Sequence, residues 1–519
     1  MEKQVRLLWV DDEIEHLKAH LFFLEEKGFT VDTATNGTDA IDMVAREHYD
    51  LVFLDENMPG ISGLETLSRL KEGDPDLPVV MITKSEEEDI MEQAIGRKIA
   101  DYLIKPVNPN QILLTIKKNL DKRRLVAETT TSGYQSEFSR LSFRINDSLT
   151  VEDWEEVYRK LVFWELELQS TGGTMDEVLK MQKAEANREF SKFVKKNYQG
   201  WLSTGEGPLL SHQLFKNKIF PLLDSGEKVF FLLIDNFRLD QWQMIRSDLS
   251  PDYQFPEESL YMSILPTATQ FARNAVFAGL MPSQIAQMYP QYWVDDDEEG
   301  SKNQFEQELL QTQIDRYRRK HKFAYHKIND PETGKKVVDG FKSLMTNDLN
   351  VIVFNFVDIL SHARTEMKMI RELAGDEAAY RSLTMSWYMH SSLRDLLKKL
   401  AAENVTVVIT TDHGTIRVGN PVKVVGDRNV NTNLRYKQGK NLAYNPKEVF
   451  EVKTPEKVFL PRPNVSTTYI FATNNDFFAY PNNYNYYVTY YKDTFQHGGV
   501  SLEEMIIPYV VLKGKDFPL

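Results

Sequence analysis

A set of carboxylate, imidazole and hydroxyl side chains in the second half of the chain has the chemistry of two metal sites beside a nucleophile. Two metal ions about 4 Å apart can hold a phosphoryl group, activate an attacking oxygen and stabilise the leaving oxygen, and they need about six oxygen or nitrogen ligands. The set comprises Asp235, Thr269, Asp358, His362, Asp412, His413 and His497. These residue types predict a metal-dependent hydrolase.

Three apolar runs would bring the carboxylates of this set together. The runs and the residues they precede are 229–234 before Asp235, 351–357 before Asp358, and 405–409 shortly before Asp412. Short continuous apolar runs are typical of strands buried on both faces. Because ligands of an open parallel sheet collect at the carboxyl ends of its strands, we expect the three carboxylates to share one crevice.

The spacing of the other members fits two separate ions. His362 follows Asp358 by four residues, which predicts a strand-end carboxylate and a first-turn imidazole on one ion. Asp412 and His413 are adjacent and precede a glycine, where a sharp turn would splay the two side chains around a second ion. His497 comes from a Gly-rich turn. Each element alone is a weak signal, since an isolated Asp-His-Gly sequence is more often an ordinary turn.

The order of these residues resembles the alkaline phosphatase superfamily, and the chain from Lys228 onward resembles its PglZ branch. The resemblance implies a large α/β domain, which we expect over residues 226–519, and two zinc ions. One zinc would be held, with the nucleophile, by Asp235, Asp412 and His413. The other would be held by Asp358, His362 and His497. The alternative is a coincidental order of polar residues scattered through a large α/β domain.

The resemblance also implies the nucleophile and the reaction. The second threonine of a Pro-Thr-x-Thr sequence, Thr269, would attack phosphorus and form a covalent intermediate, with Thr267 as the fallback. Monoesterases of the superfamily generally carry an arginine clamp for the extra phosphate charge. Arg273 and Arg238 are near in sequence, but neither can be assigned that role from the sequence. Phosphodiesters, including oligonucleotides, are therefore favoured over monoesters.

A second group of polar residues follows strand-like runs near the N-terminus. The runs and the residues after them are 7–10 with Asp11 and Asp12, 51–54 with Asp55, 79–82 with Thr83, and 102–104 with Lys105. Each polar residue lies where a strand of a doubly wound sheet would stop. Residues 1–122 therefore resemble the receiver domain of response regulators. The resemblance implies that Asp55 is the phosphoacceptor, because a carboxylate can attack a phosphodonor.

The remaining receiver residues have implied roles around Asp55. Asp11, Asp12 and Asp55, with the backbone carbonyl of Asn57, would bind one magnesium ion, since a hard cation with oxygen ligands neutralises an acidic cluster. Lys105 would pair with the phosphoryl group.

Two further receiver residues would report phosphorylation to the rest of the domain. Thr83 and Tyr102 match the switch pair, in which a hydroxyl approaches the phosphoryl group and a ring changes its packing. Lys84 departs from the family pattern, because receivers commonly place a small residue there, and it leaves the phosphoryl lifetime open.

Residues 123–225 have the apolar spacing of helices, and we expect a helical linker bundle between the two domains. Its aromatic stripe indicates a core, with a dimer surface as the alternative. The stripe consists of Trp154, Tyr158, Phe163 and Trp164. The small polar segment 129–136 is predicted to be a flexible joint.

Composition fits a three-domain α/β protein of the cytoplasm. The chain has 519 residues, 42% of them hydrophobic, which is enough for several cores. It has no cysteine, which excludes disulfides and thiolate ligands. The chain has no apolar run long enough to predict membrane insertion. A net charge of −14 opposes bulk binding to nucleic acid, although the basic segment 417–457 would either steer an anionic substrate or form an ordinary solvated loop.

Taken together, the three regions resemble PorX-type response regulators, which are associated with type IX secretion. The resemblance implies a sensor histidine kinase, a sigma factor or secretion component, and a homodimer formed on phosphorylation as partners. The sequence shows no C-terminal helix-turn-helix, so we expect a hydrolase output rather than a DNA-binding one. The alternative is a signalling adaptor whose metal site is structural and whose output is partner binding.

Overall fold

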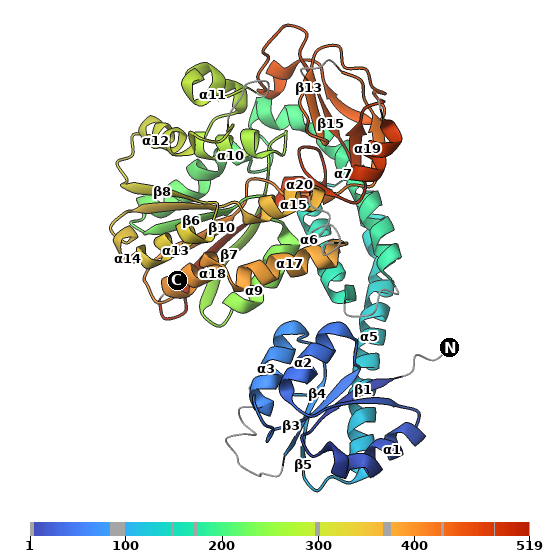
Figure 1. The fold of residues 1–519 in the computed structure, drawn as a ribbon. Helices are drawn as coiled ribbons and strands as arrows, with labels where there is room; N and C mark the ends of the chain where they lie inside the picture. Colours follow the sequence, from blue (N-terminus) through green and yellow to red (C-terminus); the bar gives the residue numbers. More distant parts are fainter. Residues whose placement is uncertain are drawn as a thin grey trace. The chain divides into compact units, whose positions relative to one another are not determined.

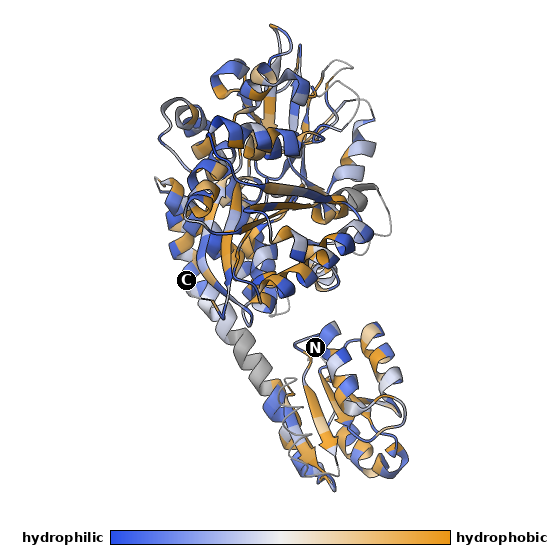
Figure 2. Cartoon of the chain, turned by 90° about the vertical axis from the view of Figure 1, so that its left-hand side faces the viewer, coloured by the Kyte–Doolittle hydropathy of each residue, from blue (hydrophilic) through white to orange (hydrophobic). Residues whose placement is uncertain are grey.

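The computed structural model describes residues 5–83, 99–147, 149–169, 175–295, 301–366, 375–426, 430–481 and 483–517, without the side chains of 121–128 and 362–366. The chain divides into two compact units, residues 1–133 and 134–519 (Figure 1). In both units the central strands of the main parallel sheet are hydrophobic (Figure 2). Lys84 and the side chain of His362 lie outside the described residues.

The first unit is built on a parallel five-stranded sheet with the order β2-β1-β3-β4-β5. Its strands are β1 (Arg6–Val10), β2 (Thr30–Ala34), β3 (Leu51–Asp55), β4 (Val79–Thr83) and β5 (Asp101–Ile104). Its helices are the 3-10 turn Ile14–Leu17, α1 (Lys18–Glu26), α2 (Gly37–Arg46), α3 (Gly63–Gly73) and the start of α5 (Pro109–Ile145). Alternate strand residues supply two separate apolar clusters, so both faces of the sheet are covered.

The prediction of a flexible joint at residues 129–136 is wrong, because these residues lie within helix α5. Tyr134 explains why this segment of small polar residues is ordered. Its ring is fully buried, and its hydroxyl donates to Gln182 Oε1 over 2.9 Å. Burial of one aromatic ring offsets the weak helix propensity of the neighbouring Thr, Ser and Gly residues.

Two long helices, α6 (Val151–Gln169) and α7 (Asp176–Thr204), pack into the core of the second unit. Three members of the aromatic stripe, Trp154, Tyr158 and Trp164, are buried there, which confirms the predicted core. Phe163 was wrongly included, because its side chain is 52% exposed. A 3-10 turn (Ser211–Gln213), a π turn (Phe215–Ile219) and α8 (Phe220–Asp224) lead to the main sheet.

The main sheet has six strands in the order β7-β18-β10-β6-β9-β8. They are β6 (Val229–Ile234), β7 (Tyr253–Met262), β8 (Phe323–Ile328), β9 (Leu349–Phe354), β10 (Thr406–Thr410) and β18 (Ile506–Gly514). Strands β10, β6, β9 and β8 are parallel, while β18 is antiparallel to β10 and β7. The three strands predicted to carry carboxylates are therefore neighbours, and their carboxyl ends lie at one edge.

Helices pack on the main sheet and on one another (Figure 1). They include α9 (Leu239–Leu249), α10 (Thr269–Ala278), α11 (Pro282–Met288), α12 (Glu306–Arg316), α13 (Pro331–Asp339), α14 (Phe341–Leu344), α15 (Phe356–Glu366), α17 (Glu377–Met389), α18 (Ser392–Leu400) and α20 (Leu502–Met505), with a 3-10 turn at Pro290–Tyr292. The predicted strand 351–357 is too long. Strand β9 ends at Phe354, and Asp358 lies in the first turn of α15.

Small sheets occupy the segment between β10 and β18. They pair β11 (Ile416–Arg417) with β17 (Phe495–Gln496), β12 (Asn420–Lys423) with β16 (Asp476–Ala479), and β13 (Tyr436–Gly439) and β14 (Val449–Val452) with β15 (Thr468–Ala472). A 3-10 turn (Pro455–Val458) and α19 (Tyr484–Tyr491) complete the segment. Within the basic segment, the side chains of Arg435 and Lys437 are buried and do not face solvent. Among the described residues, no helix is long and apolar enough to cross a membrane.

Candidate metal centre and phosphorylation site

Four side chains from separate parts of the second unit meet at the carboxyl ends of β6 and β10. Thr269 Oγ1 lies 3.3 Å from Asp235 Oδ1 and 3.1 Å from His413 Nε2. His413 Nε2 lies 3.8 Å from Asp235 Oδ1 and 3.7 Å from Asp412 Oδ2. In a tetrahedral zinc site with bonds near 2.0 Å, neighbouring ligand atoms are about 3.3 Å apart. The separations fit donors arranged around one such ion.

The electrostatics of this group also fit a cation. Asp412 Oδ2 is buried and has no hydrogen-bond partner among the described residues. Burial, together with the neighbouring Asp235 carboxylate, raises the pKa of Asp412 to about 7. Burial alone would lower the pKa of His413, but the Asp412 and Asp235 carboxylates raise it overall. Arg273 pairs with Asp235, but Asp412 Oδ2 has no hydrogen bond within the described part of the chain, so a bound cation would stabilise the charge of the Asp412 carboxylate.

The orientation of His413 is fixed by its own turn. Its Nδ1 contacts the Gly414 carbonyl oxygen at 3.0 Å, which leaves Nε2 directed at Asp235, Asp412 and Thr269. Gly414 is required here, because a Cβ on it would lie 1.9 Å from the Glu503 carbonyl oxygen. The predicted sharp turn thus brings the chain against α20.

The two candidate threonines have different surroundings. Thr269 is the first residue of α10, so its hydroxyl lies at a helix N-terminus, where negative charge is stabilised. Thr267 Oγ1 instead donates to the Gly499 carbonyl over 2.8 Å and accepts from Gly498 N over 3.1 Å. The geometry favours Thr269 as the nucleophile, because its hydroxyl faces the carboxylates.

A second pair of candidate ligands lies next to the first group. His497 Nε2 is 3.6 Å from Asp358 Oδ1, and the His497 ring stacks on the His413 ring with centroids 4.3 Å apart. His497 Nδ1 contacts the Thr267 carbonyl oxygen at 3.1 Å, so Nε2 is again the nitrogen that faces the site. The side chain of His362 lies outside the described residues.

Asn236 links the two groups and was missed by the sequence analysis. Its backbone has a φ of 62°, a left-handed conformation that Asn tolerates better than most residues. Its Nδ2 lies 3.3 Å from Asp358 Oδ1, and its backbone N lies 3.4 Å from Asp412 Oδ1. The only signal in the sequence was its position directly after Asp235 at a strand end.

The two arginines considered as phosphate clamps form ion pairs with carboxylates of the protein. Arg273 is buried, and it donates to Asp235 Oδ2 over 2.8 Å and to Glu306 Oε1 over 2.7 Å. Arg238 is buried against Asp240 and Glu377. Arg273 therefore orients a candidate metal ligand, a role that spacing alone did not reveal.

Another acidic cluster does not have the properties of a metal site. Carboxylate oxygens of Glu165, Asp240 and Glu377 lie within 4.8 Å of one another. Arg381 pairs with Glu165 and Asp240, and Arg238 pairs with Asp240 and Glu377. These guanidinium groups already neutralise the carboxylates, so we interpret the cluster as an ion-pair network.

In the first unit, the predicted receiver residues converge at the strand ends. Lys105 Nζ lies 2.7 Å from Asp11 Oδ2 and 3.2 Å from Asp55 Oδ2, and Asp12 provides a third oxygen within 4.8 Å. Asp11 and Asp55 are buried, whereas Asp12 is exposed. Burial raises the pKa of Asp55, although Lys105 opposes the shift. Oxygen ligands of this kind suit magnesium.

The other predicted receiver residues lie at the ends of the neighbouring strands. Thr83 is the buried last residue of β4, and Tyr102 is a half-buried residue of β5. The Lys105 N–H donates to the Thr83 carbonyl over 2.7 Å. Asn57 lies in the exposed loop after β3.

The fold and these two sites define a receiver domain followed by an alkaline phosphatase-like domain. Comparison with protein families agrees. Residues 214–512 match the BREX system PglZ alkaline phosphatase-like domain, 124–202 match the PorX response regulator linker domain, and 7–117 match the response regulator receiver domain. The chain belongs to the PglZ family, and its three matches are those of a PorX-type response regulator.

Individual relatives match mainly the receiver. The alginate biosynthesis transcriptional regulatory protein AlgB of Pseudomonas syringae is 36% identical over 24% of this chain and 28% of its own length, so the chain spans little more than a quarter of that relative. The transcriptional regulatory protein ResD of Bacillus subtilis is 26% identical over 38% of this chain and 93% of its own. Among solved structures, the response regulator TrrA of Thermotoga maritima is 32% identical, with a TM-score of 0.21, and covers 22% of this chain and 100% of its own.

Proposed function

We propose that this chain is a response regulator whose output is a zinc-dependent phosphodiesterase, controlled by phosphorylation of Asp55. The observation that carries the proposal is the convergence of Thr269, Asp235, Asp412 and His413 with ligand-like separations. His497 and Asp358 beside them would hold a second zinc, together with His362 as the sequence predicts.

Each residue of the site would have a separate role in phosphoester cleavage. Zinc, when bound, lowers the pKa of a coordinated hydroxyl and neutralises charge on the phosphoryl oxygens. Thr269 Oγ1 would attack phosphorus and displace the ester oxygen of the leaving group, giving a phosphothreonine ester that water then cleaves. The N-terminus of α10 would stabilise the negative charge next to Thr269. Arg273 would keep Asp235 in place throughout.

Diesters remain the favoured substrates, including oligonucleotides. A monoester carries one more negative charge than a diester and needs a cation to bind it. Arg273 and Arg238, the two arginines considered as phosphate clamps, are already paired with carboxylates. This supports a site adapted to the lower charge of a diester.

The receiver would control this output through a sensor histidine kinase as phosphodonor. The match to the PorX linker supports this arrangement. From the resemblance to PorX-type response regulators we also propose a link to type IX secretion, with a sigma factor or secretion component as partner. We propose a homodimer as the phosphorylated state, since phosphorylation of a bistable receiver alters a distant surface.

The decisive experiment compares a chromogenic phosphodiester with the matching monoester, using wild type and Thr269→Ala at saturating zinc. Loss of the nucleophile should lower diester turnover by about a hundredfold or more. Faster monoester turnover would overturn the substrate class, and full activity without Thr269 would overturn the mechanism. A wild-type protein that binds less than one zinc and hydrolyses neither ester would favour the adaptor alternative.

A further inference from the structure

One amide side chain of the linker helix α7 holds the start of α20. Asn187 is 4% exposed. Its Oδ1 accepts from the Leu502 backbone N over 2.7 Å, and its Nδ2 donates to Glu503 Oε2 over 2.9 Å. Both partners belong to α20, so the amide fixes the backbone and a side chain of the same short helix.

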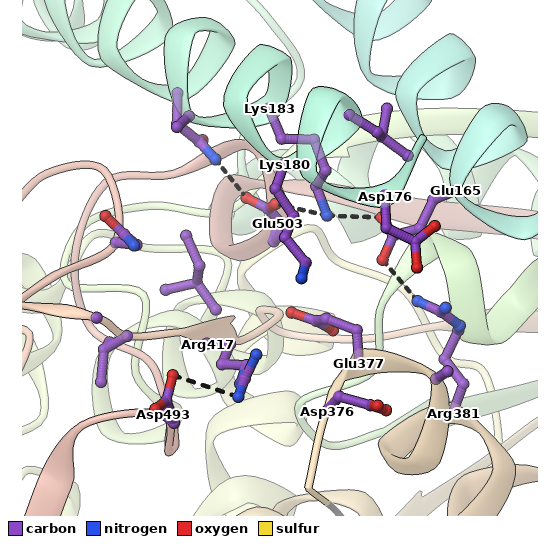
Figure 3. A pocket seen from close by; sticks show the side chains of 18 of the residues that line it. Glu165, Asp176, Lys180, Lys183, Asp376, Glu377, Arg381, Arg417, Asp493 and Glu503 are labelled. Atoms are coloured by element: carbon purple, nitrogen blue, oxygen red, sulfur yellow. Dashed lines mark hydrogen bonds and ion pairs between the residues drawn. The ribbon is translucent and has the colours of Figure 1, made fainter. Parts of the chain in front are cut away.

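Glu503 is also held by charge. Lys183, one turn before Asn187 on α7, lies with its Nζ 3.4 Å from Glu503 Oε1 and 2.6 Å from Glu165 Oε2. Figure 3 shows Lys183 between these two carboxylates, with Arg381 paired to the far side of Glu165. A cavity of about 290 Å³ borders the network, and Lys183, Asn187 and Glu503 all line it.

The chain between α20 and His497 is short and tightly held. Gly499 N donates to Glu504 Oε1 over 2.9 Å, which ties the loop to α20. Val500 N donates to the Ala472 carbonyl over 2.9 Å, which also ties the loop to β15. A displacement of α20 would therefore move His497. The turn of His413 also contacts α20, since Gly414 N donates to the Glu504 carbonyl over 3.1 Å. A smaller effect is expected on His413, because β10 ends directly before its turn and its Nδ1 contacts the Gly414 carbonyl oxygen.

We propose that Asn187 is a positioning residue for the candidate zinc ligand His497, acting through α20. The segment that matches the PorX linker would then help to position a metal ligand, in addition to connecting two domains. This inference rests on the proposed function, because it takes His497 to be a zinc ligand.

The test measures zinc affinity in the full chain after removal of metal with a chelator, by competition with a chromophoric chelator. Four variants are compared with wild type: Asn187→Ala, His497→Ala, the double variant, and Asn197→Ala. Asn197 is the matched control, since it lies on the same helix and its amide bonds the Phe193 carbonyl within that helix. Thermal unfolding of the zinc-free proteins checks that each variant folds.

Wild type and Asn197→Ala should bind two zinc ions, and His497→Ala should lose one site. Asn187→Ala should weaken that same site by about tenfold, as loss of a supporting hydrogen bond does in other metal sites, and leave the other within about twofold. In the double variant, the remaining site should match that of His497→Ala. If Asn187→Ala does not fold, Glu503→Gln should weaken the same site by a smaller factor.

Wild-type affinity at both sites in Asn187→Ala would overturn the inference. So would equal weakening of both sites, or further weakening in the His497→Ala background, because either result indicates a general structural role. A wild-type protein that binds no zinc would instead overturn the proposed function, and this inference with it.

Discussion

Replacement of Arg273 by Met tests the buried ion pairs behind the candidate metal centre. Arg273 is 2% exposed and bonds Asp235, Glu306 and Asn355. Met fills much of the same volume but cannot pair with a carboxylate. The zinc-free variant therefore keeps two buried carboxylates, on Asp235 and Glu306, without their arginine.

The expected decrease in the free energy of unfolding follows from the rule that removing one partner of a buried ion pair costs about 3–5 kcal/mol. Glu306 keeps partial compensation, because Lys327 Nζ lies 3.4 Å away and the Tyr325 hydroxyl bonds it. We therefore expect the lower end, about 3 kcal/mol, in the zinc-free protein. Zinc would balance the charge of Asp235, so the loss should be smaller in the zinc-loaded protein.

The double variant Arg273→Met, Glu306→Gln should recover part of the loss, because no uncompensated charge remains on Glu306. Urea unfolding followed by tryptophan fluorescence measures these differences. Trp9 is the only one of the seven tryptophans outside residues 134–519, so the signal reports mainly the second unit. Arg246→Met is the matched control, since its pair with Glu258 is partly exposed and should contribute less than about 1 kcal/mol. A loss below about 1 kcal/mol in zinc-free Arg273→Met would refute the reasoning.

Three further predictions concern the loop support, pH and the switch. Thr267→Val removes both hydroxyl bonds to the glycine turn and should lower diester turnover by less than Thr269→Ala does, whereas an equal loss would reopen the choice of nucleophile. Burial lowers the pKa of Lys437 to about 7, so the unfolded state binds the extra proton between pH 7 and 10 and stability should rise with pH there. The Lys437→Met variant should lack about 3 kcal/mol of this increase in the free energy of unfolding, measured by urea titration at pH 7 and pH 10. The same pH dependence in wild type and in the variant would contradict this prediction. Phosphorylation of Asp55 by a small phosphodonor with magnesium should shift the mass in light scattering towards a dimer, and an unchanged mass with phosphorylation verified would count against the switch.

The strand ends of the two sheets could be predicted because two signals coincide there. A continuous apolar run identifies a strand buried on both faces, and the first polar residue after it marks where the strand leaves the core. This worked for β6 with Asp235 and for β3 with Asp55. The predicted end of β9 was three residues too late, because apolar residues in the first turn of α15 extend the hydrophobic run past the strand.

Pairings that cross between elements could not be predicted in the same way. Glu306 lies 33 residues from Arg273, on a different helix, and nothing in its local sequence indicates a buried carboxylate. The roles of the two threonines also depended on tertiary contacts, since Thr267 is held by a glycine turn 232 residues away. Spacing in a sequence specifies local geometry, while these contacts depend on how distant elements pack.

The predicted flexible joint shows where composition misleads most. Small polar residues weaken a helix by about 0.5–1 kcal/mol each, and burial of one aromatic ring, which contributes about 1.5–3 kcal/mol, offsets several of them. Tyr134 supplies that ring, and its hydroxyl bonds Gln182 on the helix that also carries Asn187 and Lys183. A single tyrosine within a linker-like sequence thus joins α5 to the helix that supports the His497 loop. Within the segment 129–136, Tyr134 is the residue that belongs to the core of the second unit.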